Sequence, residues 1–205
     1  MRGPISEESR SNRPNLKLIY GGIHFKMSLG GCRLVAAPKD NPPFKVEALV
    51  AEEDTFLVLS ADPVVKEPRE SLEVMIEQAN EIRPEVPGSV LVRRRRNSPL
   101  EFLAIVHDLN LEPSWKEEWI SSALDKVFRE AGVRKVRSIA LPLLGTVHGS
   151  LEAERSATLL GDALRRGVPE DLQRLWLILT SGTRQKDLED IESNIKAHDT
   201  DGGNG

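Results

Sequence analysis

The apolar positions in the first part of the chain fall into short runs of strand length, separated by turn residues. Gly21 and Gly22 separate the first two runs, which favours a hairpin closed by a two-residue turn. Pro42 and Pro43 break regular structure, so the residues from Lys39 to Pro43 are expected to form a loop. The predicted strands are Leu16–Tyr20, Ile23–Met27, Cys32–Ala37, Val46–Val50 and Phe56–Leu59.

From Pro68 onward, strand-like runs alternate with segments that have helical spacing, which indicates an α/β layer fold. Ser114 and Glu117 have the pattern of a capping box, and Ser150 is the expected N-cap of a later helix. The predicted strands are Ser89–Arg94, Phe102–Val106, Ser138–Leu141 and Leu175–Leu179. The predicted helices are Leu72–Ala79, Ser114 to Gly132, Ser150 to Gly167 and Lys186–Ala197.

Length and charge narrow the class of protein. The 205 residues suit a single domain, expected at residues 16–198 between disordered tails at 1–15 and 199–205. The net charge of −4 does not indicate nucleic-acid binding, and no apolar run approaches the roughly 20 residues of a membrane helix. The one cysteine, Cys32, cannot build a disulfide framework within the chain, so the cytoplasm is the expected compartment. The four scattered histidines lack ligand spacing, so neither a metal nor a cofactor is expected.

The stretch LPLLGTVHG, from Leu141 to Gly149, places a nearly uncharged glycine loop between a predicted strand and a predicted helix. Backbone N–H groups at such a position lie near the positive end of the helix and can bind phosphate or carboxylate. The simpler interpretation is that the two glycines only form a turn. The loop therefore predicts an anion site, with the turn as the alternative.

The residues around this loop resemble the macro domain family. The stretch VRSIALPLLGTVHGSLEAERSA, from Val136 to Ala157, is similar to that family's strand, Pro-x-x-Gly-Thr-x-x-Gly loop and helix. KVEALVAEED, from Lys45 to Asp54, is similar to its Val-Asp-Ala-Ile-Val-Asn-Ala-Ala-Asn strand. PGSVLVRRRRNSPLEFLAIVHD and RLWLILTSG resemble further strands, so the resemblance runs in order from about Cys32 to Thr180.

The resemblance implies a three-layer α/β/α fold with a mixed sheet and a cleft for ADP-ribose or a related phosphorylated nucleotide. It implies that the loop residues wrap the diphosphate and the distal ribose. These residues are Gly145, Thr146, Val147, His148, Gly149 and Ser150. It also places Asp40 where the family bonds the adenine amino group. The alternative is that Asp40 simply lies in a proline-rich turn, where aspartate is common.

The sequence departs from the family at two places that matter for chemistry. Ala51 and Asp54 stand where the family has its two asparagines, and Asp54 adds a negative charge near the expected diphosphate. The first glycine-rich phosphate loop is replaced by Leu59–Pro68, which contains no glycine. We therefore expect binding without catalysis. Hydrolysis of an ADP-ribose linkage, the activity to expect if the chain is an enzyme, would need Asp54 or His148 for acid–base work.

Two hypotheses remain open on the sequence. In the first, the loop still binds ADP-ribose or a related nucleotide, and His148 could donate to a phosphate oxygen. In the second, the chain is a macro-like scaffold that binds a protein partner and no nucleotide. The basic run Arg93–Arg96 is interpreted as a solvated hairpin tip, because strand alternation would divide its side chains between two faces.

Overall fold

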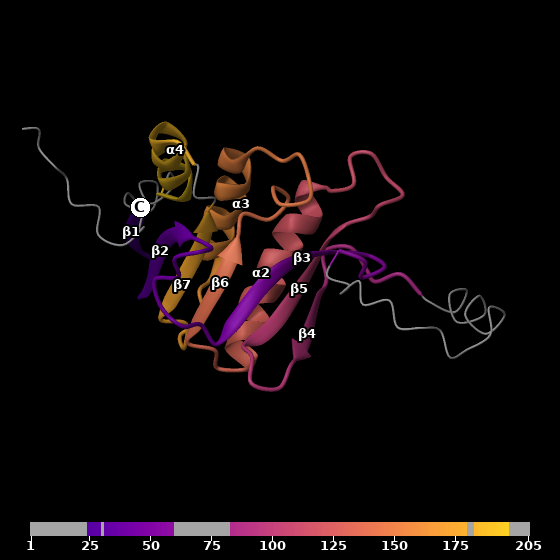
Figure 1. The fold of residues 1–205 in the computed structure, drawn as a ribbon, viewed down its shortest axis with the longest axis horizontal. Helices are drawn as coiled ribbons and strands as arrows, with labels where there is room; N and C mark the ends of the chain where they lie inside the picture. Colours follow the sequence, from indigo (N-terminus) through magenta and orange to yellow (C-terminus); the bar gives the residue numbers. More distant parts are fainter. Residues whose placement is uncertain (1–23, 30, 60–82, 180–182, 197–205) are drawn as a thin grey trace, which may run out of the picture.

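The computed structural model describes residues 24–29, 31–59, 83–179 and 183–196. Within them the chain forms a seven-stranded sheet and three helices (Figure 1). The strands are β1 (Phe25–Leu29), β2 (Cys32–Pro38), β3 (Ala48–Asp54), β4 (Val90–Arg94), β5 (Leu100–His107), β6 (Ser138–Pro142) and β7 (Arg174–Leu179). The helices are α2 (Glu117–Val133), α3 (Ala153–Arg166) and α4 (Gln185–Lys196). The predicted α/β fold with a mixed sheet is confirmed.

The sheet order is β1-β2-β7-β6-β3-β5-β4. The five inner strands are parallel to one another, and β1 and β4 add an antiparallel strand at each edge. The carboxyl ends of the five parallel strands therefore meet at one end of the sheet, where ligands bind in open α/β sheets. Among the described residues, no helix is long and apolar enough to cross a membrane.

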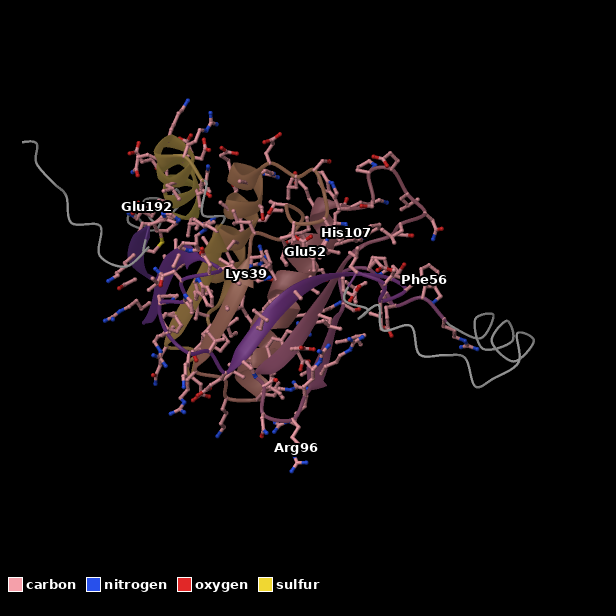
Figure 2. The ribbon with its side chains drawn as sticks, viewed as in Figure 1. Lys39, Glu52, Phe56, Arg96, His107 and Glu192 are labelled. Atoms are coloured by element: carbon pink, nitrogen blue, oxygen red, sulfur yellow. The ribbon has the colours of Figure 1, made fainter. Side chains whose placement is uncertain are left out.

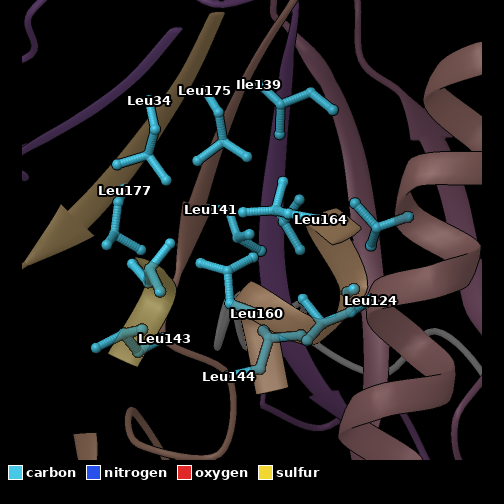
Figure 3. Close-up of a cluster of buried hydrophobic side chains, with 14 of the residues drawn as sticks. Leu34, Leu124, Ile139, Leu141, Leu143, Leu144, Leu160, Leu164, Leu175 and Leu177 are labelled. Carbon is cyan, nitrogen blue, oxygen red and sulfur yellow. The ribbon is translucent and has the colours of Figure 1, made fainter. Parts of the chain in front are cut away.

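One large apolar cluster joins the sheet to the helices. Leucines of the inner strands, such as Leu141 and Leu175, pack with Leu160 of α3 and Leu124 of α2 (Figure 3). The helical periodicity of α2 and α3 places their apolar residues on this side. A smaller cluster centred on Trp176 lies apart from it. The core therefore fixes the strand ends and the loops that follow them.

The predicted first hairpin lies largely outside the described residues. β1 pairs with β2 in an antiparallel hairpin and overlaps the predicted strand Ile23–Met27. Gly21 and Gly22, where a two-residue turn was predicted, lie outside the described residues. The predicted strand Leu16–Tyr20, the predicted helix Leu72–Ala79, and both tails lie outside the described residues.

The predicted strand Phe56–Leu59 is wrong, because these residues form a turn. The carboxylate of Asp54 accepts hydrogen bonds from the backbone N–H groups of Phe56, Val58 and Leu59. An aspartate that captures the following amides competes with strand pairing. β3 instead runs on through the acidic residues to Asp54.

Both predicted serine caps are also wrong. α2 begins at Glu117 and α3 at Ala153, and neither has a side-chain hydrogen bond at its N-cap residue. The Ser114 hydroxyl lies 3.1 Å from Nδ1 of His107, and Trp115 Nε1 donates to the Ser150 hydroxyl. The two hydroxyls thus bond to side chains near the loop instead of to helix ends.

Candidate functional site

The glycine loop, residues Gly145 to Ser150, follows β6 and leads into α3 at the carboxyl end of the sheet. The adjacent strand β3 ends in three consecutive acidic residues, Glu52, Glu53 and Asp54, all of which are buried. Burying carboxylates is costly unless hydrogen bonds or charges compensate. The partners of these carboxylates therefore decide what the loop can do.

Glu52 is the anion that the loop binds. One of its carboxylate oxygens accepts from the N–H groups of Gly145, at 2.6 Å, and Val147, at 3.3 Å. The other accepts from the N–H of His148 at 3.0 Å. The sequence predicted an anion site from the same amides, and in the structure an internal carboxylate fills it.

His107, at the end of β5, is the fourth donor to Glu52. Its Nε2 lies 2.9 Å from the Glu52 oxygen that also accepts from His148, and both side chains are fully buried. Figure 2 shows Glu52 and His107 close together near the carboxyl ends of the strands. Because a carboxylate only accepts, the shared proton of this contact is carried by Nε2.

The environment keeps Glu52 ionised. Burial alone would raise the pKa of this carboxyl. The hydrogen bonds from His107 and from the amides of His148 and Val147 outweigh burial and hold the pKa of Glu52 below its usual value. A fixed negative charge therefore sits inside the loop at neutral pH.

The rest of the loop is closely packed. Thr146 donates from both its N–H and its hydroxyl to the carbonyl of Leu143. Gly145 has φ of +84°, and a Cβ on it would lie 2.6 Å from Cδ1 of Ile120. A Cβ on Gly149 would lie 2.5 Å from the carbonyl oxygen of Gly145. All four amides from Gly145 to His148 thus bond inside the protein, and two glycines are required by close packing.

Asp54 serves a different local structure. Its side chain is buried and accepts from three amides of the turn that follows β3. Burial would raise the pKa of Asp54, but these amides lower it overall. Asp54 therefore anchors the 55–59 turn, and a role in ligand binding stays a prediction.

Asp40 lies in a second feature, a cleft of about 1070 Å3 beside the loop. The structure brings Asp40 together there with Thr146 and Val147, while the other predicted site residues do not line the cleft. Its charged lining is acidic, with two cations against four carboxylates. These are Lys39, Arg184, Asp40, Glu152, Glu154 and Asp187.

Sequence reasoning missed Glu52 and His107. A signal was present, because three acidic residues directly follow the apolar residues of a predicted inner strand. Such carboxylates must find donors, and a glycine loop is a ready source of them. Across the described ranges, no group of histidine, cysteine, aspartate or glutamate side chains could hold a metal ion.

No family model and no curated protein sequence matches this chain. Solved structures do match. The alignment with a mutant macrodomain of Oceanobacillus iheyensis with ADPR covers 84% of this chain and 97% of the macrodomain, at 15% sequence identity and a TM-score of 0.61. The macro domain of ganglioside induced differentiation associated protein 2 covers 80% and 84%, at 12% identity and TM-score 0.57. The macrodomain of Mycobacterium tuberculosis DarG covers 73% and 100%, at 18% identity and TM-score 0.52. With sequence identity this low the likeness concerns architecture, and on that ground the chain has the macrodomain fold.

Proposed function

We propose that this chain is a non-catalytic macrodomain-fold module that does not bind the diphosphate of ADP-ribose through its glycine loop and that acts by binding a protein partner. The observation that carries this proposal is the bonding of three loop amides to the buried carboxylate of Glu52. A diphosphate at the same amides would have to displace that carboxylate. It would otherwise lie beside a second, uncompensated negative charge.

The acidic lining of the neighbouring cleft also disfavours binding of a diphosphate. Its four carboxylates outnumber its two cations, and one of those cations, Arg184, is already paired with Asp187. An anionic ligand therefore meets unfavourable charge both at the loop and in the cleft.

The carboxyl end of the sheet also presents apolar side chains to solvent. Large exposed residues occur in three segments that are hydrogen-bonded to one another through Thr55, His107 and Glu85. These exposed residues are Phe56, Val58, Val86, Leu109 and Leu111. Grouped exposed apolar side chains are typical of protein-binding surfaces. This surface supports a protein partner.

A second candidate function is binding of a nucleotide such as ADP-ribose in the cleft, with Asp40 accepting from a base amino group. The cleft itself favours this candidate, because Asp40, Thr146 and Val147 line one cavity of nucleotide size. Two of the solved macrodomains with this fold are complexes with ADPR and with ADP. In this candidate, the phosphates lie outside the Glu52-filled loop.

Isothermal titration calorimetry with ADP-ribose separates the two candidates. The scaffold proposal expects no heat up to about 1 mM, where a ligand worth roughly −4 kcal/mol would half-saturate the protein. Saturable heat that disappears in Asp40→Asn, but persists in the control Asp171→Asn, an exposed aspartate outside the cleft, would favour the nucleotide candidate.

Pull-down experiments test the protein-binding part. Leu109→Ser combined with Leu111→Ser should abolish capture of a partner. Val133→Ser, an even more exposed apolar position at the end of α2, should leave capture intact. Equal capture by all variants would count against a binding surface at the carboxyl end.

A further inference from the structure

A second large cleft lies at the opposite end of the sheet, where the parallel strands begin. It has a volume of about 1110 Å3 and is lined by the segments that precede β3 and β6, the β4–β5 turn and the end of α2. Figure 2 shows Arg96 at this end, far from Glu52 and His107. The cleft is therefore separate from the glycine loop and from the acidic cleft beside it.

Three consecutive arginines line this cleft, contrary to the expectation from strand alternation. β4 ends at Arg94, and the chain then turns, so Arg95 and Arg96 do not follow the alternating pattern of the strand. Arg94, Arg95 and Arg96 consequently border one cavity. The interpretation of Arg93–Arg96 as a run divided between two faces is wrong for these three residues.

The cleft concentrates positive charge in a chain whose net charge is −4. Its lining contains five cations, namely Lys45, Arg94, Arg95, Arg96 and Arg134, against the single carboxylate of Glu47. Glu47 is already held by Arg137, while Arg95 pairs with Glu101 and Arg134 with Glu130. Within the described part of the chain, Lys45, Arg94 and Arg96 form no ion pair with an acidic side chain. Three cations therefore remain for an anionic ligand.

Aromatic rings accompany these cations. Phe44 is half-buried in the lining, and the guanidinium of Arg174 lies 4.9 Å from its ring centroid. Trp176 also lines the cleft and donates from Nε1 to the carbonyl of Ala37, which fixes the indole. Pro42, Val46 and Pro99 complete apolar walls. A polyanion without flat apolar groups would leave these walls uncovered.

We propose that this basic cleft, between Phe44 and Arg96, binds a short single-stranded nucleic acid. Arginine forks bond phosphate oxygens well, and bases stack on aromatic or guanidinium planes. Phe44 with Arg174 supplies such a platform, and Lys45, Arg94 and Arg96 supply the phosphate contacts. An acidic peptide would satisfy the cations, but it offers a planar group to the Phe44 platform only where it carries an aromatic side chain, whereas every nucleotide carries a base. This site is independent of the function proposed above for the carboxyl end.

Fluorescence anisotropy with a labelled single-stranded oligonucleotide of about ten nucleotides tests the proposal. We expect saturable binding. The logarithm of the association constant should fall with the logarithm of the salt concentration with a slope of roughly −2, because three cations neutralise phosphates on a single strand. Arg94→Glu combined with Arg96→Glu should weaken binding about tenfold or more and should reduce the slope by about 0.7 for each arginine lost. Phe44→Leu should weaken binding with the salt slope unchanged.

The matched control is Lys26→Glu combined with Lys186→Glu, which reverses two charges on exposed residues of β1 and α4 outside the cleft. This variant should bind the oligonucleotide as the wild type does. Equal loss in the control and in the double arginine variant would overturn the proposal, because only net charge would then matter. More effective competition by an acidic peptide than by unlabelled oligonucleotide would also overturn it, and would assign the cleft to acidic proteins.

Discussion

Nε2 of His107 lies 2.9 Å from a carboxylate oxygen of Glu52, and both side chains are completely buried. This pair connects the ends of β5 and β3, and the same carboxylate bonds the loop that follows β6. One ionised side chain thus joins three segments distant in sequence. The stability of the carboxyl end of the sheet should depend on it.

The first prediction concerns Glu52→Ala. The substitution leaves the His107 ring and three loop amides without their acceptor, so the free energy of unfolding should fall by about 3–5 kcal/mol. Urea denaturation measures this change. The control is Glu101→Ala, which removes a partly exposed partner of Arg95 and should cost less than about 1 kcal/mol. Equal costs would mean that the Glu52 network contributes little.

The second prediction uses two glycines with nearly equal backbone strain. Gly145 and Gly31 have φ of +84° and +88°, so alanine should cost about 1–2 kcal/mol at either position from the backbone alone. Only at Gly145 would the new Cβ be crowded, by Ile120 and Leu151. Gly145→Ala should therefore lower the free energy of unfolding by a further ~1–3 kcal/mol. Similar denaturation midpoints for the two variants would show that the loop is loosely packed.

The third prediction follows from the lowered pKa of Glu52. A group whose folded pKa lies below its unfolded value of 4.5 stabilises the protein above that pH, and the stabilisation disappears as pH falls through the folded pKa. The free energy of unfolding of the wild type should therefore fall as pH drops below about 4.5. The free energy of unfolding of Glu52→Gln should fall less steeply with pH. The decrease that remains below pH 3.8 includes the contribution of Asp54, whose pKa is also lowered. Parallel curves would show that Glu52 does not titrate differently in the folded state.

The fourth prediction concerns Cys32. Its side chain is buried in β2, and burial raises the pKa of the thiol to about 11. Because the thiolate is the reactive form, a water-soluble thiol reagent at pH 7 should modify the folded protein only at the rate of unfolding. Complete modification should occur in denaturant. Rapid stoichiometric reaction of the native protein would show that this strand opens easily.

The sequence predicted the inner strands and helices well, since their apolar periods are strong. Failures occurred where a polar side chain had several available partners. Ser114 has a good capping pattern, yet its hydroxyl lies beside His107, a neighbour that only the tertiary fold supplies. Asp54 forms a turn with local amides, which converts the apolar run Phe56–Leu59 from the expected strand into a turn.

The candidate site was predicted only in part, again because the partner of a polar group comes from a distant segment of the chain. The glycine loop predicted free amides for an anionic ligand, but local sequence cannot show that a carboxylate on a neighbouring strand bonds to those amides. Glu52 is 93 residues away from Gly145 in the chain, and only the pairing of β3 with β6 brings the two together. The Arg94–Arg96 cluster was missed because strand alternation was extended past the end of β4.

Nuclear magnetic resonance of the loop amides tests the central claim most directly. The amide signals of Gly145, Val147 and His148 should stay unchanged when ADP-ribose is added to the wild type, because Glu52 already accepts from all three. The same signals should move together in Glu52→Gln without any ligand. Saturable movement of these three signals in the wild type on adding ADP-ribose would contradict the claim that the loop holds its own anion.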